Sequence, residues 1–233
     1  MQFKDIEEAL RNLNQRGYVR SLRNGTTGIG YTLEQLLGLR ESNISIPDIG
    51  GRIEVKAVRK DSDSLITLFT FNKGVWKISQ KELISQYGYE DKKGRKALKN
   101  TLFYKHSIPQ GLTIDVDEKN NVVNLIDVYT GQALATWDMY VIVGKFMTKL
   151  GRLLLVLADR DKRKGVEWFH YNEAYLLTDP QARKFIEAFK QGSIGIDLRM
   201  HLRENGTVRN RGTAFRIREK DLILLYDKRK KII

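Results

Sequence analysis

Hydrophobic and polar residues alternate along Arg52–Val58, which is the pattern of a strand that buries one face. Every second residue from Ile53 onward is apolar, whereas Glu54 and Lys56 belong to the opposite face. A strand keeps two charges on one face where that face borders solvent or a functional cleft. The pattern therefore predicts a strand that presents an acid and a base side by side.

A second acid precedes this strand and is separated from it by a glycine-containing turn sequence. Asp48 is followed by Gly50 and Gly51, which are typical of a hairpin turn. A two-residue loop would place Asp48 opposite Ile53, on the wrong face, whereas an odd-numbered loop or a glycine bulge would place it beside Glu54. We expect the odd loop or the bulge, and hence two carboxylates on one face of the hairpin.

The same periodicities predict an α+β (or α/β) fold with a central mixed sheet flanked by helices. Helical spacing extends over 2–16, Lys77–Tyr89, Met139–Leu150, Pro180–Gln191 and, as a closing helix, Asp221–Ile233. Strands are expected at Thr113–Asp117, Val122–Tyr129, Ala133–Asp138, Leu153–Ala158, Ser193–Arg199, Thr213–Arg218 and, beside Arg52–Val58 in the core, Ser64–Phe71. Residues 159–165 read as a charged loop. No linker, repeat or low-complexity stretch interrupts the chain, so we expect one domain over 1–233.

Glu34 has two interpretations. Thr32 and Gln35 have capping-box spacing, which predicts a short helix that begins at Thr32 and ends at Gly38. An acid in the first turn of a helix is stabilised by the helix dipole, which is a purely structural role. The alternative is that Glu34 overhangs the charged strand as a further catalytic acid.

Composition narrows the class of partner. The 233 residues carry a formal net charge of +13, with an isoelectric point near 9.8. Such an excess favours a polyanion, and nucleic acid before an anionic membrane. There is no cysteine, which excludes disulfides and thiolate metal sites. No apolar run is long enough to span a membrane and the N-terminus does not resemble a signal peptide, so we expect a cytoplasmic protein.

Basic residues gather in a few segments. The loop Arg20–Gly30 contains two arginines and three glycines, and it either lets backbone amides approach phosphates or serves as a connector. The segment Arg199–Arg218 is rich in arginine, the side chain best suited to bidentate contacts with guanine edges or phosphates. The candidate DNA-binding residues are Lys73, Arg199, His201, Arg209, Arg211, Arg216 and Arg218; the alternative is a solvated basic surface.

These features together resemble a known nuclease family. Asp48, Glu54 and Lys56 have the spacing of the PD-(D/E)xK motif, here with a literal Pro47. Around it stand GIGYTLEQLLG at 28–38, TLF at 67–69, TWD at 136–138, AYLLT at 174–178 and RGTAFRI at 211–217. The set, in this order over nearly the whole chain, is similar to the MvaI/BcnI restriction endonucleases, which are related to the mismatch-repair nickase MutH.

The resemblance implies a two-lobed PD-(D/E)xK nuclease with double-stranded DNA in a cleft between the lobes. It implies a type II restriction endonuclease that acts as a monomer, one strand at a time, on a CC-N-GG type site. Ala214 stands where the BcnI-like branch has a histidine, which favours CCWGG. A cognate DNA methyltransferase in a bacterial or archaeal host would protect the same site.

The resemblance also implies roles for individual residues. Asp48, Glu54 and the carbonyl of Val55 would hold Mg²⁺, which prefers hard oxygen ligands. Lys56 would be the catalytic lysine, and Glu34 matches an acid near the site. A MutH-like nicking endonuclease or a DNA-binding protein without catalysis are the alternative functions.

Overall fold

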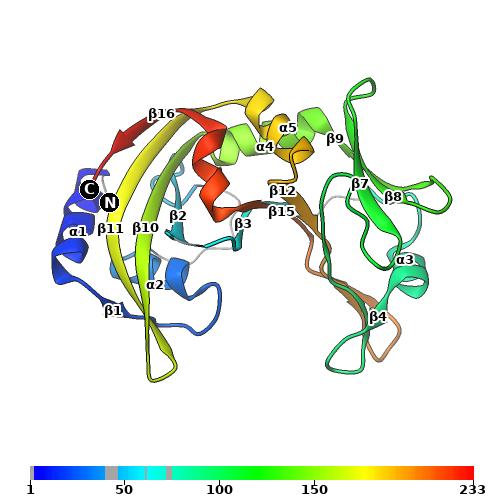
Figure 1. The fold of residues 1–233 in the computed structure, drawn as a ribbon, viewed down its shortest axis with the longest axis horizontal. Coiled ribbons are helices and arrows are strands. Elements are labelled where there is room, and N and C mark those ends of the chain that lie inside the picture. The colour runs from blue at the N-terminus through cyan, green and yellow to red at the C-terminus, as the bar shows by residue number, and fades with distance from the viewer. Residues whose placement is uncertain (1–2, 40–46, 61, 72–74) are drawn as a thin grey trace. The chain divides into compact units, whose positions relative to one another are not determined.

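The computed structural model describes residues 3–39, 47–60, 62–71 and 75–233 (Figure 1). The chain forms two compact units built from segments that are distant in sequence. Unit 1 comprises Met1–Ile66, Met147–Gln181 and Glu219–Ile233, and unit 2 comprises Thr67–Phe146 and Ala182–Arg218. The prediction that the whole chain works as one two-lobed domain stays a prediction.

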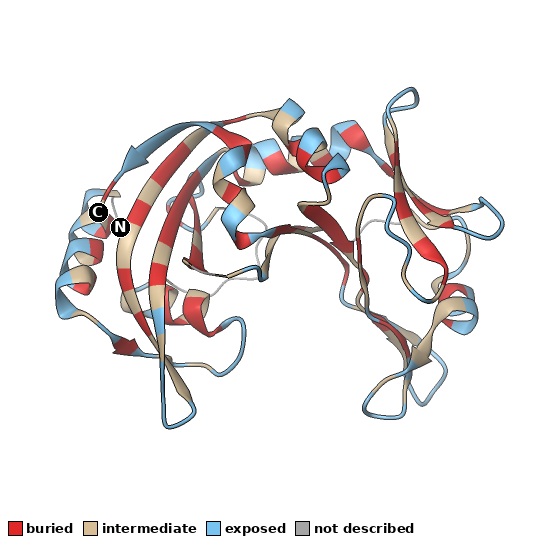
Figure 2. Cartoon of the chain, in the orientation of Figure 1, coloured by how far each residue is buried: buried red, intermediate tan, exposed pale blue. Residues whose placement is uncertain are grey.

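Unit 1 is organised around a five-stranded mixed sheet. Its strands run in the order β1-β11-β10-β2, with β16 also paired to β11, over Val19–Arg20, Val166–Pro180, Arg152–Arg163, Glu54–Arg59 and Tyr226–Lys231. Only β2 and β10 are parallel; β11 runs antiparallel to its partners. The apolar run at the start of β10 is buried on both faces, as expected of a central strand (Figure 2).

Two helices cover one face of this sheet. The apolar stripes of α1 (Phe3–Arg16) and α2 (Gly28–Leu36) pack in one core with Val55 and Ala57 of β2. Glu54 and Lys56 alternate with those residues, so they point to the other face of the sheet. Unit 1 closes with the 3₁₀ helix η1 (Glu219–Leu225) before β16.

Unit 2 contains three small sheets and an aromatic core. One sheet has the order β3-β15-β12-β6 (Leu65–Phe71, Thr213–Arg218, Ile194–Asp197, Thr101–Leu102), and another has β14-β13-β5-β4 (Val208–Asn210, Met200–Leu202, Lys96–Leu98, Tyr89–Glu90). The third is the meander β7-β8-β9 (Leu112–Asp117, Val122–Asp127, Ala133–Asp138). The helices are α3 (Gln80–Tyr87), α5 (Ala182–Lys190) and α4 (Met139–Lys149), whose last turn belongs to unit 1. Stacked rings such as Phe69 on Phe215, with centroids 4.9 Å apart, fill the core.

The α+β class and the central mixed sheet are confirmed, but four local predictions were wrong. The early helix begins at Gly28, so Thr32 lies inside it, where its hydroxyl accepts from Leu22 N. The expected closing helix is η1 followed by β16. The expected charged loop 159–165 is mostly strand, because β10 continues to Arg163. The segment Leu65–Phe71 pairs with β15 in a different sheet from β2.

Candidate active site

The turn before β2 has the odd number of residues that the sequence argument required. Ile49 and Ile53 form an antiparallel bridge, so three residues, 50 to 52, make the loop. Gly50 and Gly51 have φ of 56° and 67°, values that glycine adopts without strain. Because Ile49 faces Ile53, Asp48 lies opposite Glu54.

Asp48 is exposed and bound to the edge of β2. Its Oδ2 accepts a hydrogen bond of 2.8 Å from the backbone N of Val55. The opposite edge of β2 pairs with β10. In an extended strand the N–H and C=O of one residue point to the same edge, so the Val55 carbonyl shares the edge on which Asp48 lies.

Glu54 is buried, with only 2% of its surface exposed. Its Oε1 accepts from Lys56 Nζ at 2.5 Å and lies 3.5 Å from Lys149 Nζ. Its Oε2 is buried and has no hydrogen-bond partner within the part of the chain that the structure describes. A buried carboxylate oxygen left unpaired costs roughly 1–3 kcal/mol or more, so this atom is suited to receive a cation.

Lys149 is a second lysine beside Glu54, and the sequence did not reveal it. It ends α4, where a basic residue already has a sufficient explanation in the helix dipole. Only the tertiary fold brings it to Glu54, so no local sequence signal for this contact was present.

Tyr226 lies near Glu54. Burial and the charge of Glu54 raise the pKa of Tyr226, whose hydroxyl donates to the Leu150 carbonyl at 2.8 Å.

Glu34 lies near the end of α2 and not in its first turn, so the favourable dipole interaction proposed for it is absent. Its carboxylate packs over Gly30 of the same helix, where an added Cβ would lie 3.9 Å from Oε1. No group of three or more histidine or carboxylate side chains is placed to hold a metal among the residues described. Glu34 therefore does not join Asp48 and Glu54 as a third ligand here, and its catalytic role stays a prediction.

The donor set fits a hard divalent cation. Asp48 and Glu54 supply carboxylate oxygens, one of them unpaired, and Val55 supplies a carbonyl on the same edge. Mg²⁺ is commonly bound by one or two carboxylates and keeps several waters, so two protein carboxylates are enough.

The sequence model of the MvaI/BcnI restriction endonuclease family matches residues 7–226. The chain belongs to this family. It is a restriction endonuclease, that is, a site-specific deoxyribonuclease, and the resemblance inferred from its motifs is confirmed.

Two solved structures are similar over nearly their full length. One, described as a restriction endonuclease MvaI–cognate DNA substrate complex, has a TM-score of 0.80 at 27% identity, covering 98% of this chain and 97% of that chain. The other, restriction endonuclease MvaI in the absence of DNA, has a TM-score of 0.58 at 26% identity, covering 100% and 99%. No curated protein matches the chain. No helix of the described residues is long and apolar enough to cross a membrane.

The arginines that sequence analysis assigned to DNA binding in this endonuclease fall into two groups. Arg209, Arg211 and Arg218 are exposed. Arg199 is engaged within unit 2, because it donates to the carbonyls of Gly212 and Arg211 and to Thr70 Oγ1, at 3.0 to 3.2 Å. Lys73 lies outside the described residues.

Arg216 is half-buried beside an acid. Its Nη1 lies 3.5 Å from Asp197 Oδ2. Burial raises the pKa of Asp197, an effect that the charges of Arg216 and Arg199 oppose. On the same strand Ala214, Phe215 and Ile217 are all fully buried, so the strand does not alternate strictly between core and solvent.

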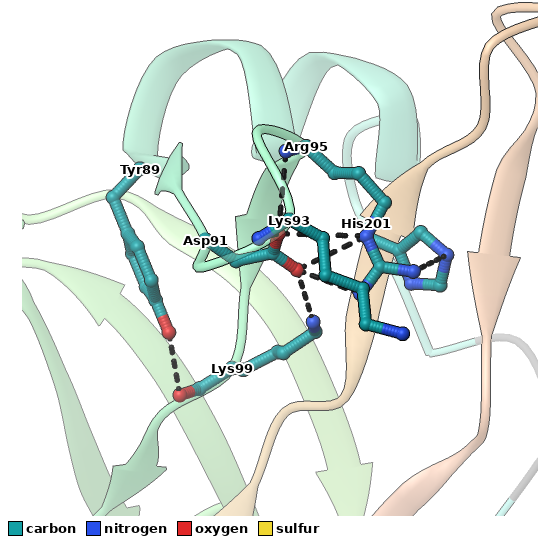
Figure 3. Close-up of polar contacts among 6 residues, drawn as sticks. All are labelled: Tyr89, Asp91, Lys93, Arg95, Lys99 and His201. Atoms are coloured by element: carbon teal, nitrogen blue, oxygen red, sulfur yellow. Dashed lines mark hydrogen bonds and ion pairs between the residues drawn. The ribbon is translucent and has the colours of Figure 1, made fainter.

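An acidic residue organises the basic hairpin β4–β5 (Figure 3). Asp91 accepts from Arg95 Nε at 3.1 Å, from Arg95 Nη2 at 2.8 Å and from Lys99 Nζ. These bonds hold the pKa of Asp91 well below its usual range. Arg95 Nη1 also lies 3.3 Å from His201 Nε2, and burial together with Arg95 and Lys99 lowers the pKa of His201. His201 thus belongs to a preorganised basic cluster, and only the tertiary fold joins it to the β4–β5 hairpin.

Proposed function

We propose that this restriction endonuclease is a Mg²⁺-dependent type II enzyme that hydrolyses both strands of duplex DNA at a CC-N-GG type site. CCWGG is the favoured form, because Ala214 replaces the histidine of the BcnI-like branch. The enzyme acts as a monomer and cuts one strand in each catalytic event. Similarity to an MvaI structure described with cognate DNA supports double-stranded DNA as the substrate.

The observation that carries this proposal is the buried Glu54 with its unpaired Oε2, opposite Asp48 and between two lysines. Two lysines and an exposed acid around a buried carboxylate have no evident packing role. They form a site where a cation and a phosphate can be held together.

Each residue of the site has a distinct role in this proposal. Asp48, Glu54 and the Val55 carbonyl would hold Mg²⁺, which when bound supplies charge stabilisation at the phosphate and a more acidic water. Lys56 orients the attacking water and neutralises charge that develops on the phosphate. Lys149 fixes the Glu54 carboxylate from α4 and acts as a positioning residue. Glu34 remains a candidate catalytic acid.

On unit 2, the exposed Arg209, Arg211 and Arg218 are proposed to contact DNA, with Arg216 and His201 beside them. Arg199 shapes the loop before β15 through its bonds to two carbonyls. A methyltransferase that modifies the same site is the expected partner in the host.

Incubation of the purified protein with supercoiled plasmid tests the function. We expect nicked circles first, then linear fragments with unique ends, only when Mg²⁺ is present and EDTA is absent. Sequencing the ends should place the cuts within CCWGG. Nicked circles that never become linear would support the MutH-like alternative, and binding without cutting would support a non-catalytic protein.

A further inference from the structure

A basic pocket lies in unit 1, at the opposite end of β2 from Glu54. We call it the hairpin pocket; Arg23, Arg59, Arg160, Lys162, Lys164 and Glu167 line it, with a volume of about 630 Å³. One wall is the loop before α2, and the other is the β10–β11 hairpin, whose tip is exposed in Figure 2. The sequence singled out that loop as able to approach phosphates, but the active site does not include it.

The pocket is mostly positively charged because the basic and acidic residues of β10 lie on opposite faces of the strand. Arg160 and Lys162 point to the pocket, while Asp159 and Asp161 alternate to the other side. Among the residues that the structure describes, the lining thus holds five cations and one acid, Glu167.

Glu167 neutralises only part of that charge. It pairs with Arg59 at 3.0 Å and with Arg160 at 3.7 Å. Lys162 and Lys164 make no ion pair within the described ranges.

Arg59 forms a buried floor to the pocket and is 7% exposed. Its Nη1 donates to the Thr26 carbonyl at 3.4 Å and its Nη2 to Glu167 at 3.0 Å. Its Nε is buried and has no acceptor in the part of the chain described. A buried cation with an unused N–H is costly unless an acceptor arrives, and a phosphate oxygen is such an acceptor.

Both walls are fixed by backbone geometry. Lys164 and Gly165 have φ of 48° and 83°, which indicates a type I′ turn that closes the hairpin tightly. A Cβ on Gly28 would lie 2.3 Å from the Arg23 carbonyl oxygen, so only glycine permits this loop. The pocket is therefore preorganised.

We propose that the hairpin pocket binds a backbone phosphodiester of the DNA substrate, away from the phosphate that is cut. The proposal rests on the proposed endonuclease function. Glu54 and Arg59 are five residues apart on β2, about 16 Å at the usual strand rise. Their side chains point to opposite faces of β2, so the phosphate in the pocket is not the one that is cut and belongs to a flank of the site. Among the described residues no aromatic ring lines the pocket, which favours a backbone phosphate over a stacked base.

Single methylphosphonate substitutions along a cognate duplex test this, because each removes one phosphate charge. We expect wild-type affinity to fall about tenfold at one or two neighbouring flanking positions. The Arg160→Ala/Lys162→Ala variant should bind the unmodified duplex more weakly, and its salt slope should fall by about one unit, the value for one phosphate. Its affinity should no longer respond to methylphosphonate substitution at those positions. Lys228→Ala/Lys230→Ala, which removes two exposed cations from β16, should keep the wild-type profile.

Arg59→Lys keeps the positive charge but removes Nε. If thermal unfolding shows an intact fold, the affinity of this variant should also be insensitive to methylphosphonate substitution at the same flanking positions. If the wild-type protein cuts plasmid and the variants respond to every methylphosphonate substitution as wild type does, the proposed role of the pocket is wrong. The proposed function would still stand in that case. Thermal stabilisation by inorganic phosphate in wild type but not in the Arg160→Ala/Lys162→Ala variant, with equal DNA profiles, would assign the pocket to a free phosphate and overturn the DNA contact.

Discussion

Asp48→Ala is expected to abolish Mg²⁺-dependent cleavage while DNA binding remains. The carboxylate supplies one of two side-chain ligands for the cation, and it also bonds Val55 N, which fixes the edge of β2. Loss of a metal ligand should lower the single-turnover rate by at least about a thousandfold, equivalent to roughly 4 kcal/mol of transition-state stabilisation. Rate should be measured at saturating enzyme, and affinity by mobility shift without Mg²⁺.

Glu8→Ala is the matched control, because it removes an exposed carboxylate from α1 in the same unit. It should cut at the wild-type rate. Cleavage by Asp48→Ala at the wild-type rate would show that Asp48 is not part of the active site.

Lys56→Ala should also abolish cleavage, but with the opposite effect on the metal. The ammonium lies 2.5 Å from Glu54 Oε1 and neutralises the carboxylate. Without it we expect Mg²⁺ to bind as tightly as in wild type or more tightly, while the rate again falls by about a thousandfold. Isothermal titration with Mg²⁺ in the presence of DNA, set beside single-turnover rates, separates the two residues.

Lys4→Ala, an exposed lysine on α1, serves as the control. If Lys56→Ala lost Mg²⁺ affinity together with activity, the residue would be part of the metal site's framework and not the catalytic lysine.

The sequence could place Asp48, Glu54 and Lys56 close together because they lie in one hairpin. Alternation fixes which side chains share a face, and the three-residue loop that joins Ile49 to Ile53 follows from the same register argument. Residues so close in sequence need no tertiary information.

Lys149 was missed for the opposite reason, since only the packing of α4 brings it to Glu54. The same holds for His201, which the pairing of β5 with β13 brings to Arg95. Glu34 was misplaced in its helix because the capping-box spacing at Thr32 competes with a start four residues earlier.

The closing segment shows how tertiary pairing overrides a helical pattern. The run of apolar residues at 222–226 favours a closing helix, yet the structure forms the 3₁₀ helix η1 and then the strand β16. Pairing with β11 satisfies the backbone of β16, and the exposed lysines and arginine of that strand face solvent.

The most direct test of the central claim is the single-turnover cleavage rate of Glu54→Gln on a CCWGG duplex with Mg²⁺. Glutamine keeps the size of the side chain and a carbonyl oxygen for Lys56, but it removes the buried charge to which the site owes its affinity for a cation. We expect no measurable cleavage, with duplex binding and thermal stability close to wild type. Cleavage at the wild-type rate would contradict the central claim.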